Sequence, residues 1–397
     1  LSAVEIYQRL SVANPQVYEP DLAMTQNNLG NLYRDTQRYK ESEEMYLSVL
    51  TVYQRLTIAN LQVYEPDLAR AQNNLGNLYR DTQRYKESEE MYLSAVEIYQ
   101  RLSVANPQVY EPDLAMVQNN LGLLYSDIQR YEDSEKMYLS AVEIYRRLAA
   151  ANPQVYEPDL AETQNDLGIL YSDTRRYEES EEMYLSAMEI RRRLAVANPQ
   201  VYEPGLARTQ YNLGCLYSDT RRYEESEKMY LSAMEIRRRL AVANPQVYEP
   251  DLADTQYNLG CLYYNIQRYE ESGEMYLSAL KVYQRLTVAD PQVYEPYLVR
   301  ACNNLSFLFL AQGNFEEAER YAREGAKYDS THHTIYTNLA ASLLFQGRYA
   351  EAEEIYLRYK EELKEDFLSD FEDFYQRGII PPEREDDVER IKKLLSK

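Results

Sequence analysis

The sequence is poor in the residues that most often carry catalysis or cross-linking. Its 397 residues include no tryptophan, two histidines and three cysteines, Cys215, Cys261 and Cys302. Three cysteines are too few for a disulfide framework in a chain of this length. Free thiols favour a reducing compartment, so we expect the protein to be cytoplasmic.

Long apolar runs and an excess of positive charge are also missing. No stretch approaches the ~18 apolar residues that a membrane-spanning helix needs. Aspartate and glutamate number 65 against 43 lysines and arginines, which gives a net charge of −22. Phosphate backbones and anionic bilayers are bound through basic surfaces. We therefore expect binding to neither nucleic acid nor membrane.

No group of residues has the spacing of a catalytic or metal site. The two histidines, His332 and His333, are adjacent, and successive helical side chains point about 100° apart, so the pair cannot share one metal ion. We expect them at an exposed helix start. Cys215 and Cys261 lack a histidine nearby in sequence to activate them, and no glycine-rich phosphate motif is present. The sequence predicts a protein that is not an enzyme and has no cofactor or metal.

What the sequence has instead is a repeat. The seven residues from Asn27 to Tyr33 recur, with small changes, at steps of 46 residues. The recurrences lie at 73–79, 119–125, 165–171, 211–217, 257–263 and 303–309. Residues 1–24 are identical to residues 93–116. A period of this length is typical of stacked supersecondary units.

Each repeat has the pattern of two helices. Apolar residues at steps of three and four follow Pro112, and proline suits the first turn of a helix. We therefore expect the first helix to open at Glu-Pro-Asp, with Asp113 at the positive end of its dipole. The second helix should begin near Tyr131 and end at an Ala-Asn-Pro segment, because proline cannot continue a helix. Stacking on neighbouring repeats would bury both apolar faces.

These residues resemble a known family. In the second repeat the matching residues are Leu75, Gly76, Tyr79, Ser88, Tyr92 and Ala95. The pattern resembles the tetratricopeptide repeat, and its Asn-Asn-Leu-Gly-x-Leu-Tyr motif and long period resemble kinesin-light-chain-type repeats. The resemblance implies an all-α fold, a right-handed α-solenoid of helix-turn-helix repeats with C-terminal capping helices.

The repeat boundaries predict four segments. Residues 1–19 would be the second helix of a partial repeat, and residues 20–328 seven repeats of 46 residues. Residues 329–364 would form a final 34-residue repeat, and residues 365–397 an amphipathic cap over its apolar face. Because residue 1 falls inside a repeat, we expect the natural chain to begin earlier.

The resemblance implies that the first helix of each repeat lines a concave groove. Counting the repeat's glycine as position eight, groove positions vary between repeats while core leucines do not. The predicted partner-binding residues are Asn28, Asn31, Arg34, Arg70, Asn74, Asn77, Arg80, Asn120, Tyr211, Asn212, Tyr257, Asn258, Tyr264, Asn304, Phe307 and Leu310. The N-terminal groove would be polar and partly basic. The C-terminal groove would be an apolar anchor site formed by Tyr257, Tyr264, Phe307 and Leu310.

The asparagines at position six have two interpretations. Their amides could hold an extended peptide backbone, or they could satisfy neighbouring helices. The sequence thus predicts a scaffold or adaptor that binds a peptide or partner domain, with a ligand that has acidic and apolar ends. One alternative is a regulatory or sensor arm of a larger protein whose effector domain lies N-terminal to this segment. A second is a self-assembling structural element, although we expect a monomer with at most weak self-association.

Overall fold

The computed structural model describes residues 2–328 and 334–396, and every regular element within these ranges is helical. The elements are α1 (Ser2–Ala13), α2 (Pro15–Asp35), α3 (Tyr39–Ala59), α4 (Leu61–Asp81), α5 (Tyr85–Ala105), α6 (Pro107–Asp127), α7 (Tyr131–Ala151), α8 (Pro153–Asp173), α9 (Tyr177–Ala197), α10 (Pro199–Asp219), α11 (Tyr223–Ala243), α12 (Pro245–Asn265), α13 (Tyr269–Ala289), α14 (Pro291–Ala311), α15 (Phe315–Gly325), α16 (Thr334–Phe345), α17 (Tyr349–Arg358), α18 (Lys360–Gln376), the 3-10 turn η1 (Pro382–Arg384) and α19 (Glu385–Leu395).

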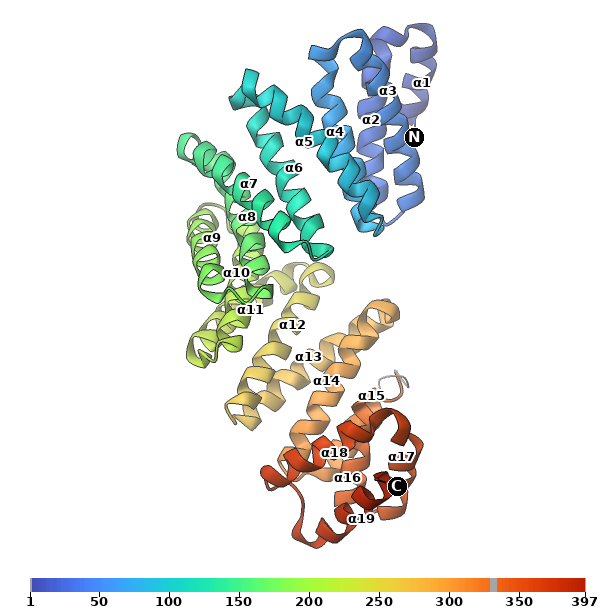
Figure 1. The fold of residues 1–397 in the computed structure, drawn as a ribbon, viewed down its shortest axis with the longest axis vertical. Helices are drawn as coiled ribbons and strands as arrows, with labels where there is room; N and C mark the ends of the chain where they lie inside the picture. Colours follow the sequence, from blue (N-terminus) through green and yellow to red (C-terminus); the bar gives the residue numbers. More distant parts are fainter. Residues whose placement is uncertain (1, 329–333, 397) are drawn as a thin grey trace. The chain divides into compact units, whose positions relative to one another are not determined.

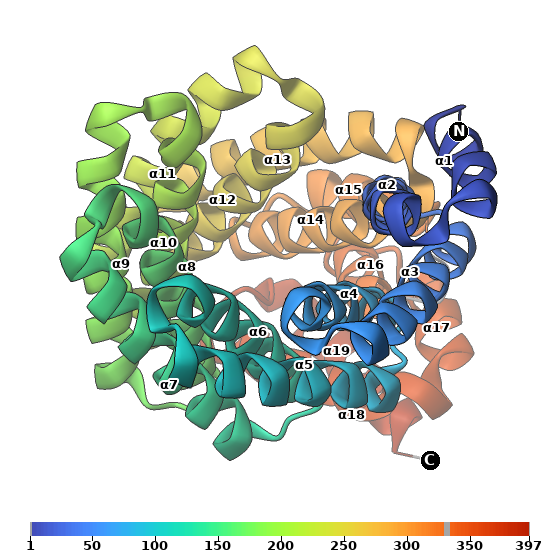
Figure 2. The same cartoon turned by 90° about the horizontal axis from the view of Figure 1, so that it is seen from above.

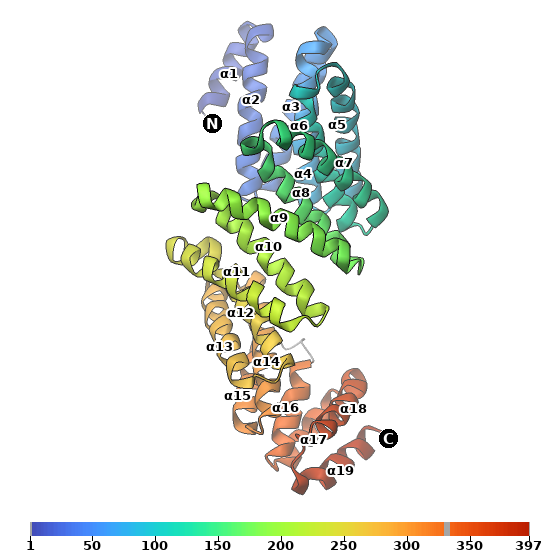
Figure 3. The same ribbon diagram turned by 90° about the vertical axis from the view of Figure 1, so that its left-hand side faces the viewer.

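The chain forms two compact units, Leu1–Tyr202 and Glu203–Lys397. In the first unit the helices from α1 to α9 each pack against the next (Figures 1 and 2), and α2, α4, α6 and α8 also touch in turn. In the second unit α11 to α17 stack in the same way, and α18 packs on α16 and α17 (Figures 1 and 3). The predicted all-α solenoid of helix pairs is confirmed.

The first helix of each repeat begins earlier than the sequence suggested. α6 starts at Pro107, and Pro112 lies in its second turn. The expected start at Pro112 is therefore wrong by five residues. Pro112 gives up only the bond to the carbonyl of Gln108, and Gln108 is exposed, so water can satisfy that carbonyl. Asp113 consequently lies beyond the first turn.

A tyrosine packed on a glycine joins the two helices of each repeat. A Cβ atom on Gly122 would lie 2.9 Å from Cδ1 of Tyr138, so no larger residue fits while that ring stays. The Ser134 hydroxyl donates to the Gly122 carbonyl at 2.8 Å. The same three residue types recur in six repeats.

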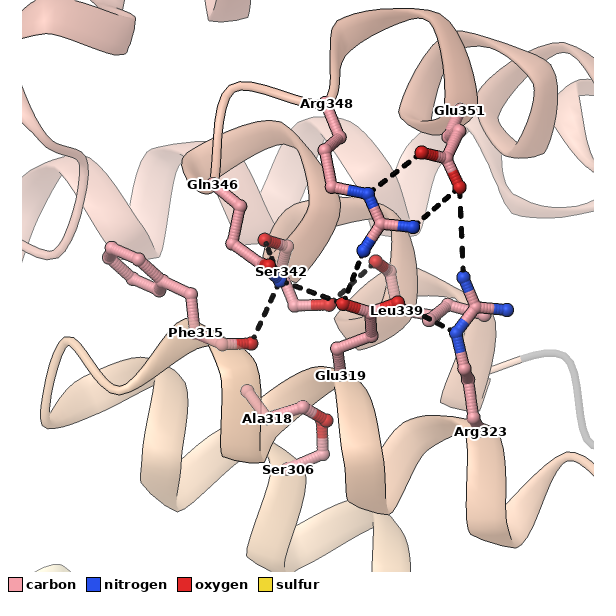
Figure 4. A network of polar contacts seen from close by, with 10 residues as sticks. All are labelled: Ser306, Phe315, Ala318, Glu319, Arg323, Leu339, Ser342, Gln346, Arg348 and Glu351. Atoms are coloured by element: carbon pink, nitrogen blue, oxygen red, sulfur yellow. Dashed lines mark hydrogen bonds and ion pairs between the residues drawn. The ribbon is translucent and has the colours of Figure 1, made fainter.

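The seventh repeat reverses this arrangement. Ser306 stands at the glycine position, Ala318 at the serine position and Ala322 at the tyrosine position. The Ser306 hydroxyl now donates to the Ala318 carbonyl at 2.7 Å, between two residues labelled in Figure 4. A side chain is accommodated at the glycine position in the one long repeat that lacks the tyrosine.

An arginine in the turn between the two helices ties successive repeats together. The Arg130 guanidinium lies 4.2 Å from the centre of the Tyr125 ring and pairs with Asp133 at 2.8 Å. It also pairs at 2.7 Å with Glu89, which belongs to the preceding repeat. The Tyr125 hydroxyl donates to Glu89 at 3.0 Å, and burial followed by this bond raises the pKa of Tyr125 to about 12.

We call this arrangement the arginine lock. It recurs around Arg84, Arg176 and Arg268. Figure 4 shows the version in the last repeat, where Arg348 lies between Glu319 and Glu351 at 2.6 Å from each. An exposed ion pair contributes little by itself. The recurrence of the lock at one end of successive helix pairs nevertheless makes that end densely charged.

The same turns hold a backbone strain that substitution should relieve. Gln129 has a φ of 60°, a conformation that costs roughly 1 kcal/mol for a residue with a side chain. Gly313 and Gly347 have comparable φ values in the last two turns of this kind. We expect Gln129→Gly to stabilise the protein by about 1 kcal/mol in chemical denaturation.

An exposed helical glutamine provides the matched control for that measurement. Gln100 lies within α5, where glycine destabilises by about 1 kcal/mol, so Gln100→Gly should shift the unfolding midpoint in the opposite direction. If both substitutions destabilise the protein, the left-handed turn is not strained.

Candidate functional site

The first helices of the N-terminal repeats form a polar groove of about 830 Å³. Of the predicted partner-binding residues, those that line it are Asn28, Asn31, Arg34, Arg70, Asn74, Asn77 and Asn120. The other lining residues are Met24, Asn27, Asp35, Tyr53, Asp67, Asn73, Asp113 and Met116. The structure therefore gathers α2, α4 and α6 around one amide-rich surface, which we call the amide groove.

Two amides of the groove are held with their N–H groups available. Asn31 Oδ1 accepts a hydrogen bond from the Tyr46 hydroxyl at 2.5 Å, and Asn77 Oδ1 accepts one from Tyr92 at 2.6 Å. Neither Nδ2 atom donates a hydrogen bond to a described residue. These two asparagines form a donor row, one amide from each of the first two repeats.

The asparagines at position six are oriented the other way. Asn74 Nδ2 donates to Asn27 Oδ1 at 2.9 Å, and Asn120 Nδ2 donates to Asn73 Oδ1 at 2.9 Å. The Nδ2 atoms of these two amides are therefore paired with the helix of the preceding repeat, as one of the two interpretations expected. Their Oδ1 atoms have no donor in the described chain, and Asn74 and Asn120 form an acceptor row.

The amide pattern stops after the third repeat. Asn119 Oδ1 is buried without a hydrogen-bond partner. The residue 47 positions further on, which donates in the earlier repeats, is Asp166, and a carboxylate has no hydrogen to donate. Position nine also changes from asparagine to Leu123 and Ile169.

The groove is not basic, which corrects the expectation from its arginines. Arg34 pairs with Asp81 at 3.4 Å, and Arg70 pairs with Asp67. Arg80 does not line the groove and pairs with Asp127 at 3.6 Å. Nearby carboxylates thus neutralise each predicted arginine.

Two carboxylates of the groove are partly buried. Burial raises the pKa of both Asp67 and Asp113 above the ordinary range for aspartate. Asp113 has no ion-pair partner among the described residues, whereas Asp67 has Arg70. Asp35, Asp67 and Asp113 together outnumber the two lining arginines, so the groove carries a slight negative charge.

In the C-terminal unit, tyrosine hydroxyls take the place of asparagine Oδ1 atoms as acceptors of the hydrogen bonds between successive repeats. Asn258 Nδ2 donates to the Tyr211 hydroxyl at 2.6 Å, and Asn304 Nδ2 donates to the Tyr257 hydroxyl at 2.7 Å. The remaining predicted amide, Asn212, is half-buried on α10. The Tyr257 ring is almost fully buried, and the Arg300 guanidinium lies over it, 4.3 Å from the ring centre. This tyrosine is a packing residue rather than an open contact surface.

The two cysteines at position nine lie beside these tyrosines. Tyr230 donates its hydroxyl hydrogen to Cys215 Sγ at 3.3 Å. Burial raises the pKa of the Cys215 and Cys261 thiols, so neither is an activated nucleophile. Both thiols, like that of Cys302, are free.

The residues of the predicted apolar anchor site have different surroundings, and of the four Phe307 lines a pocket, of about 230 Å³, with the predicted Asn304. Leu310 is completely buried in the core. Phe307 packs against Phe374 of α18 with ring centres 6.0 Å apart, and Arg377 donates to the Tyr264 hydroxyl at 2.7 Å. The chain's own C-terminal segment therefore covers Phe307 and Tyr264. Sequence patterns identified the amphipathic stretch that contains Phe374 but not its contact with the groove.

Metal sites, membrane-spanning helices and the histidine pair were also considered in the sequence. Among residues 2–328 and 334–396, no cluster of histidine, cysteine and acidic side chains could hold a metal ion. Within the same ranges, no helix has both the length and the hydropathy to cross a membrane. His332 and His333 lie outside the described residues.

Comparison with known families identifies the repeats. Models described as tetratricopeptide repeat match residues 21–101, 67–147, 113–193 and 159–239. Further models with the same description match residues 252–291 and 309–368. No curated protein matches the sequence.

Several solved structures share the fold. BtubC (BKLC) from P. vanneervenii, a kinesin-light-chain-like protein, is 25% identical, with a TM-score of 0.50 over 61% of this chain and 89% of its own. The STAND protein PH0952 from Pyrococcus horikoshii, with its tetratricopeptide repeat sensor, is 18% identical. Its TM-score is 0.59 over 93% of this chain and 54% of its own. The apo form of RapI is 15% identical, with a TM-score of 0.56 over 94% of this chain and 97% of its own.

Proposed function

Because the chain belongs to the tetratricopeptide repeat family, with kinesin-light-chain-like repeats, we propose that it is a protein–protein interaction scaffold that binds an extended segment of a partner in the amide groove. Proteins of this family are in general scaffolds rather than enzymes. The observation that carries the proposal is the fixed orientation of the groove amides. The donor row and the acceptor row are the two kinds of group that a peptide backbone needs.

An extended ligand suits these rows better than a helix does. A helix has already paired its backbone N–H and C=O groups internally, whereas an extended chain leaves them available. Packed helices lie about 8–10 Å apart, and an extended chain in the polyproline II conformation advances about 3.1 Å per residue. One repeat of the groove would therefore meet about every third residue of the ligand.

The charge of the groove does not favour a ligand with an acidic end, which the sequence had led us to expect. With each lining arginine paired and Asp113 unpaired, a neutral or weakly basic segment fits better than an acidic one. The apolar contacts on offer are Met24 and Met116, both exposed, and methionine adapts to varied side chains. We propose that backbone recognition dominates and that side-chain selectivity is modest.

An isosteric substitution tests this function. Asn31→Asp and Asn77→Asp keep the oxygen that accepts from Tyr46 or Tyr92 but replace each open N–H donor by an acceptor. We expect peptides selected from a display library on the wild-type protein to bind the double variant at least about tenfold more weakly, because a buried unpaired acceptor costs more than 1 kcal/mol. Fluorescence anisotropy measures the affinities.

The control variant adds the same charge outside the groove. Gln54→Glu and Gln100→Glu also convert two amides to carboxylates in the first two repeats, at exposed positions on α3 and α5. This variant should bind the selected peptides as the wild type does. Equal affinity of all three proteins would exclude the amide groove as the binding site.

The other two roles expected from the sequence stay predictions. A sensor arm of a larger protein would use the same groove, and the similarity to PH0952 shows the fold alone. A self-assembling element requires a surface on which copies meet, which is a separate question from the groove.

A further inference from the structure

The turns that join one repeat to the next expose aliphatic side chains. In the last turn of α5, Val104 is 85% exposed, and two residues into α6, Val109 is 53% exposed. Ile58 is 89% exposed at the end of α3. The residues at these two positions of the repeat, which we call the valine edge, are Val12, Val17, Ile58, Val63, Val104, Val109, Val155, Val196 and Val201 in the N-terminal unit and Val242, Val247, Val288 and Val293 in the C-terminal unit.

The valine edge carries almost no charge. Residues 102–110 read Leu-Ser-Val-Ala-Asn-Pro-Gln-Val-Tyr, without an ionisable acid or base that is charged at neutral pH. The corresponding segments of the other long repeats are equally uncharged apart from Asp290. The nearest arginine, Arg101, pairs with Glu65. Further pairs of this kind, such as Arg147 with Glu111, border the uncharged segments, whereas the arginine locks lie within the opposite turns themselves.

Packing within the chain does not require these side chains. A side chain that is 85% exposed contributes almost nothing to the core, and valine is a poor helix former at an exposed helical position. Isolated exposed apolar residues are ordinary. Here they recur at the same two places in stacked repeats, with Ala150 in place of the first valine in the third repeat, so the N-terminal unit presents them as an interrupted line along one edge.

We propose that the valine edge is a self-association surface, on which a second copy of this chain docks edge to edge. Each copy has a net charge of −22, so two copies meet with the least local repulsion where the facing surface has no charged side chain. Periodicity favours it too. Two copies have the same spacing between ridges, so every ridge of one edge can pack between ridges of the other.

A membrane is the less suitable occupant of this surface. Interfacial membrane contacts combine aromatic residues with lysine or arginine, whereas the tyrosines of the edge are half-buried and the arginines beside it, such as Arg101, are paired with glutamates. The acidic chain is also repelled by anionic lipid. A stable protein interface buries about 800 Å² on each partner, which calls for several consecutive edges rather than one. Association should therefore be weak, and its affinity should rise steeply with the number of consecutive repeats that take part.

Analytical ultracentrifugation of the full chain over a wide concentration range tests the proposal. We expect a reversible monomer–dimer equilibrium that added NaCl strengthens, because salt screens the repulsion between two acidic chains. The variant Ile58→Lys/Val104→Lys/Val196→Lys places ammonium groups on both facing edges. Its dissociation constant should rise by at least about 100-fold, since like charges brought together cost several kcal/mol.

The matched control changes three other exposed aliphatic residues to lysine in the same repeats. Leu47, Leu93 and Leu185 are 42%, 46% and 41% exposed on the second helices. The variant Leu47→Lys/Leu93→Lys/Leu185→Lys receives the same added charge and should dimerise as the wild type does. Circular dichroism checks that both variants are folded. A wild type that stays monomeric in high salt, or an edge variant that dimerises like the control, contradicts the proposal.

Discussion

Deletion of residues 360–397 is expected to unfold the last repeats and to make the chain aggregate. α18 and α19 bury at least seven apolar side chains, Leu363, Phe367, Phe371, Phe374, Val388, Ile391 and Leu395. Full burial of such a side chain contributes roughly 1.5–3 kcal/mol, so the segment contributes on the order of 10 kcal/mol. Its loss also uncovers Tyr356 and Phe307, which α18 now covers.

Thermal unfolding and light scattering measure this effect. Deletion of residues 1–14 is the control at the other end, because Val4 is the one buried residue among the described side chains of α1. That deletion should lower the melting temperature only slightly and leave the protein monomeric. If the C-terminal deletion behaves in the same way, α18 and α19 are appendages and not a cap.

Gly122→Ala should destabilise the protein, and the same substitution should become stabilising when Tyr138 is also replaced. The added Cβ would overlap the Tyr138 ring at 2.9 Å, and overpacking of this kind costs roughly 1–3 kcal/mol. Tyr138→Ala alone should cost about 3–5 kcal/mol, because the ring is 1% exposed. In that background the Cβ fits, and alanine gains about 1 kcal/mol over glycine in a helix.

A double-mutant cycle from urea unfolding therefore should give a coupling energy of at least about 2 kcal/mol between the two residues. The exposed residues Glu44 and Gln100 offer a non-coupled comparison, because they lie near opposite ends of α3 and α5 and neither takes part in the glycine–tyrosine packing. Additive effects at Gly122 and Tyr138 would mean that the ring moves aside at little cost. The residue types at Ser306 and Ala322 would then have no packing explanation.

Residue pattern was sufficient to predict what depends on a single helical face. The period of 46 residues and the apolar stripe beginning at Leu114 predicted the helix pairs and their stacking. The start of α6 was less determined, because Pro107 and Pro112 both suit a first turn. Proline in the second turn costs one hydrogen bond near the solvent, where water can satisfy the carbonyl of Gln108.

Pattern was insufficient where an atom's partner lies in another repeat. Arg34 looked like an open cation because its partner, Asp81, lies in the next repeat, beyond any local motif. Tyr264 and Phe307 looked like a free apolar surface because their cover, Arg377 and Phe374, comes from the far end of the chain. For the amides, the sequence showed at which positions of the repeat they recur, but not which atom of each amide faces outward.

The arginine lock has a consequence for how such a chain can change its length. From Arg84 to Arg268, its bonds join residue types that recur at the same positions in successive repeats, as with Arg130 and Glu89 or Arg84 and Glu43. Recombination that adds or removes one whole repeat therefore recreates each inter-repeat bond at the junction. The identity of residues 1–24 with 93–116 is what recent duplication would leave. The number of repeats can therefore change by duplication or deletion of whole repeats without loss of an arginine lock. An insertion of any other length would separate an arginine from its partner in the preceding repeat.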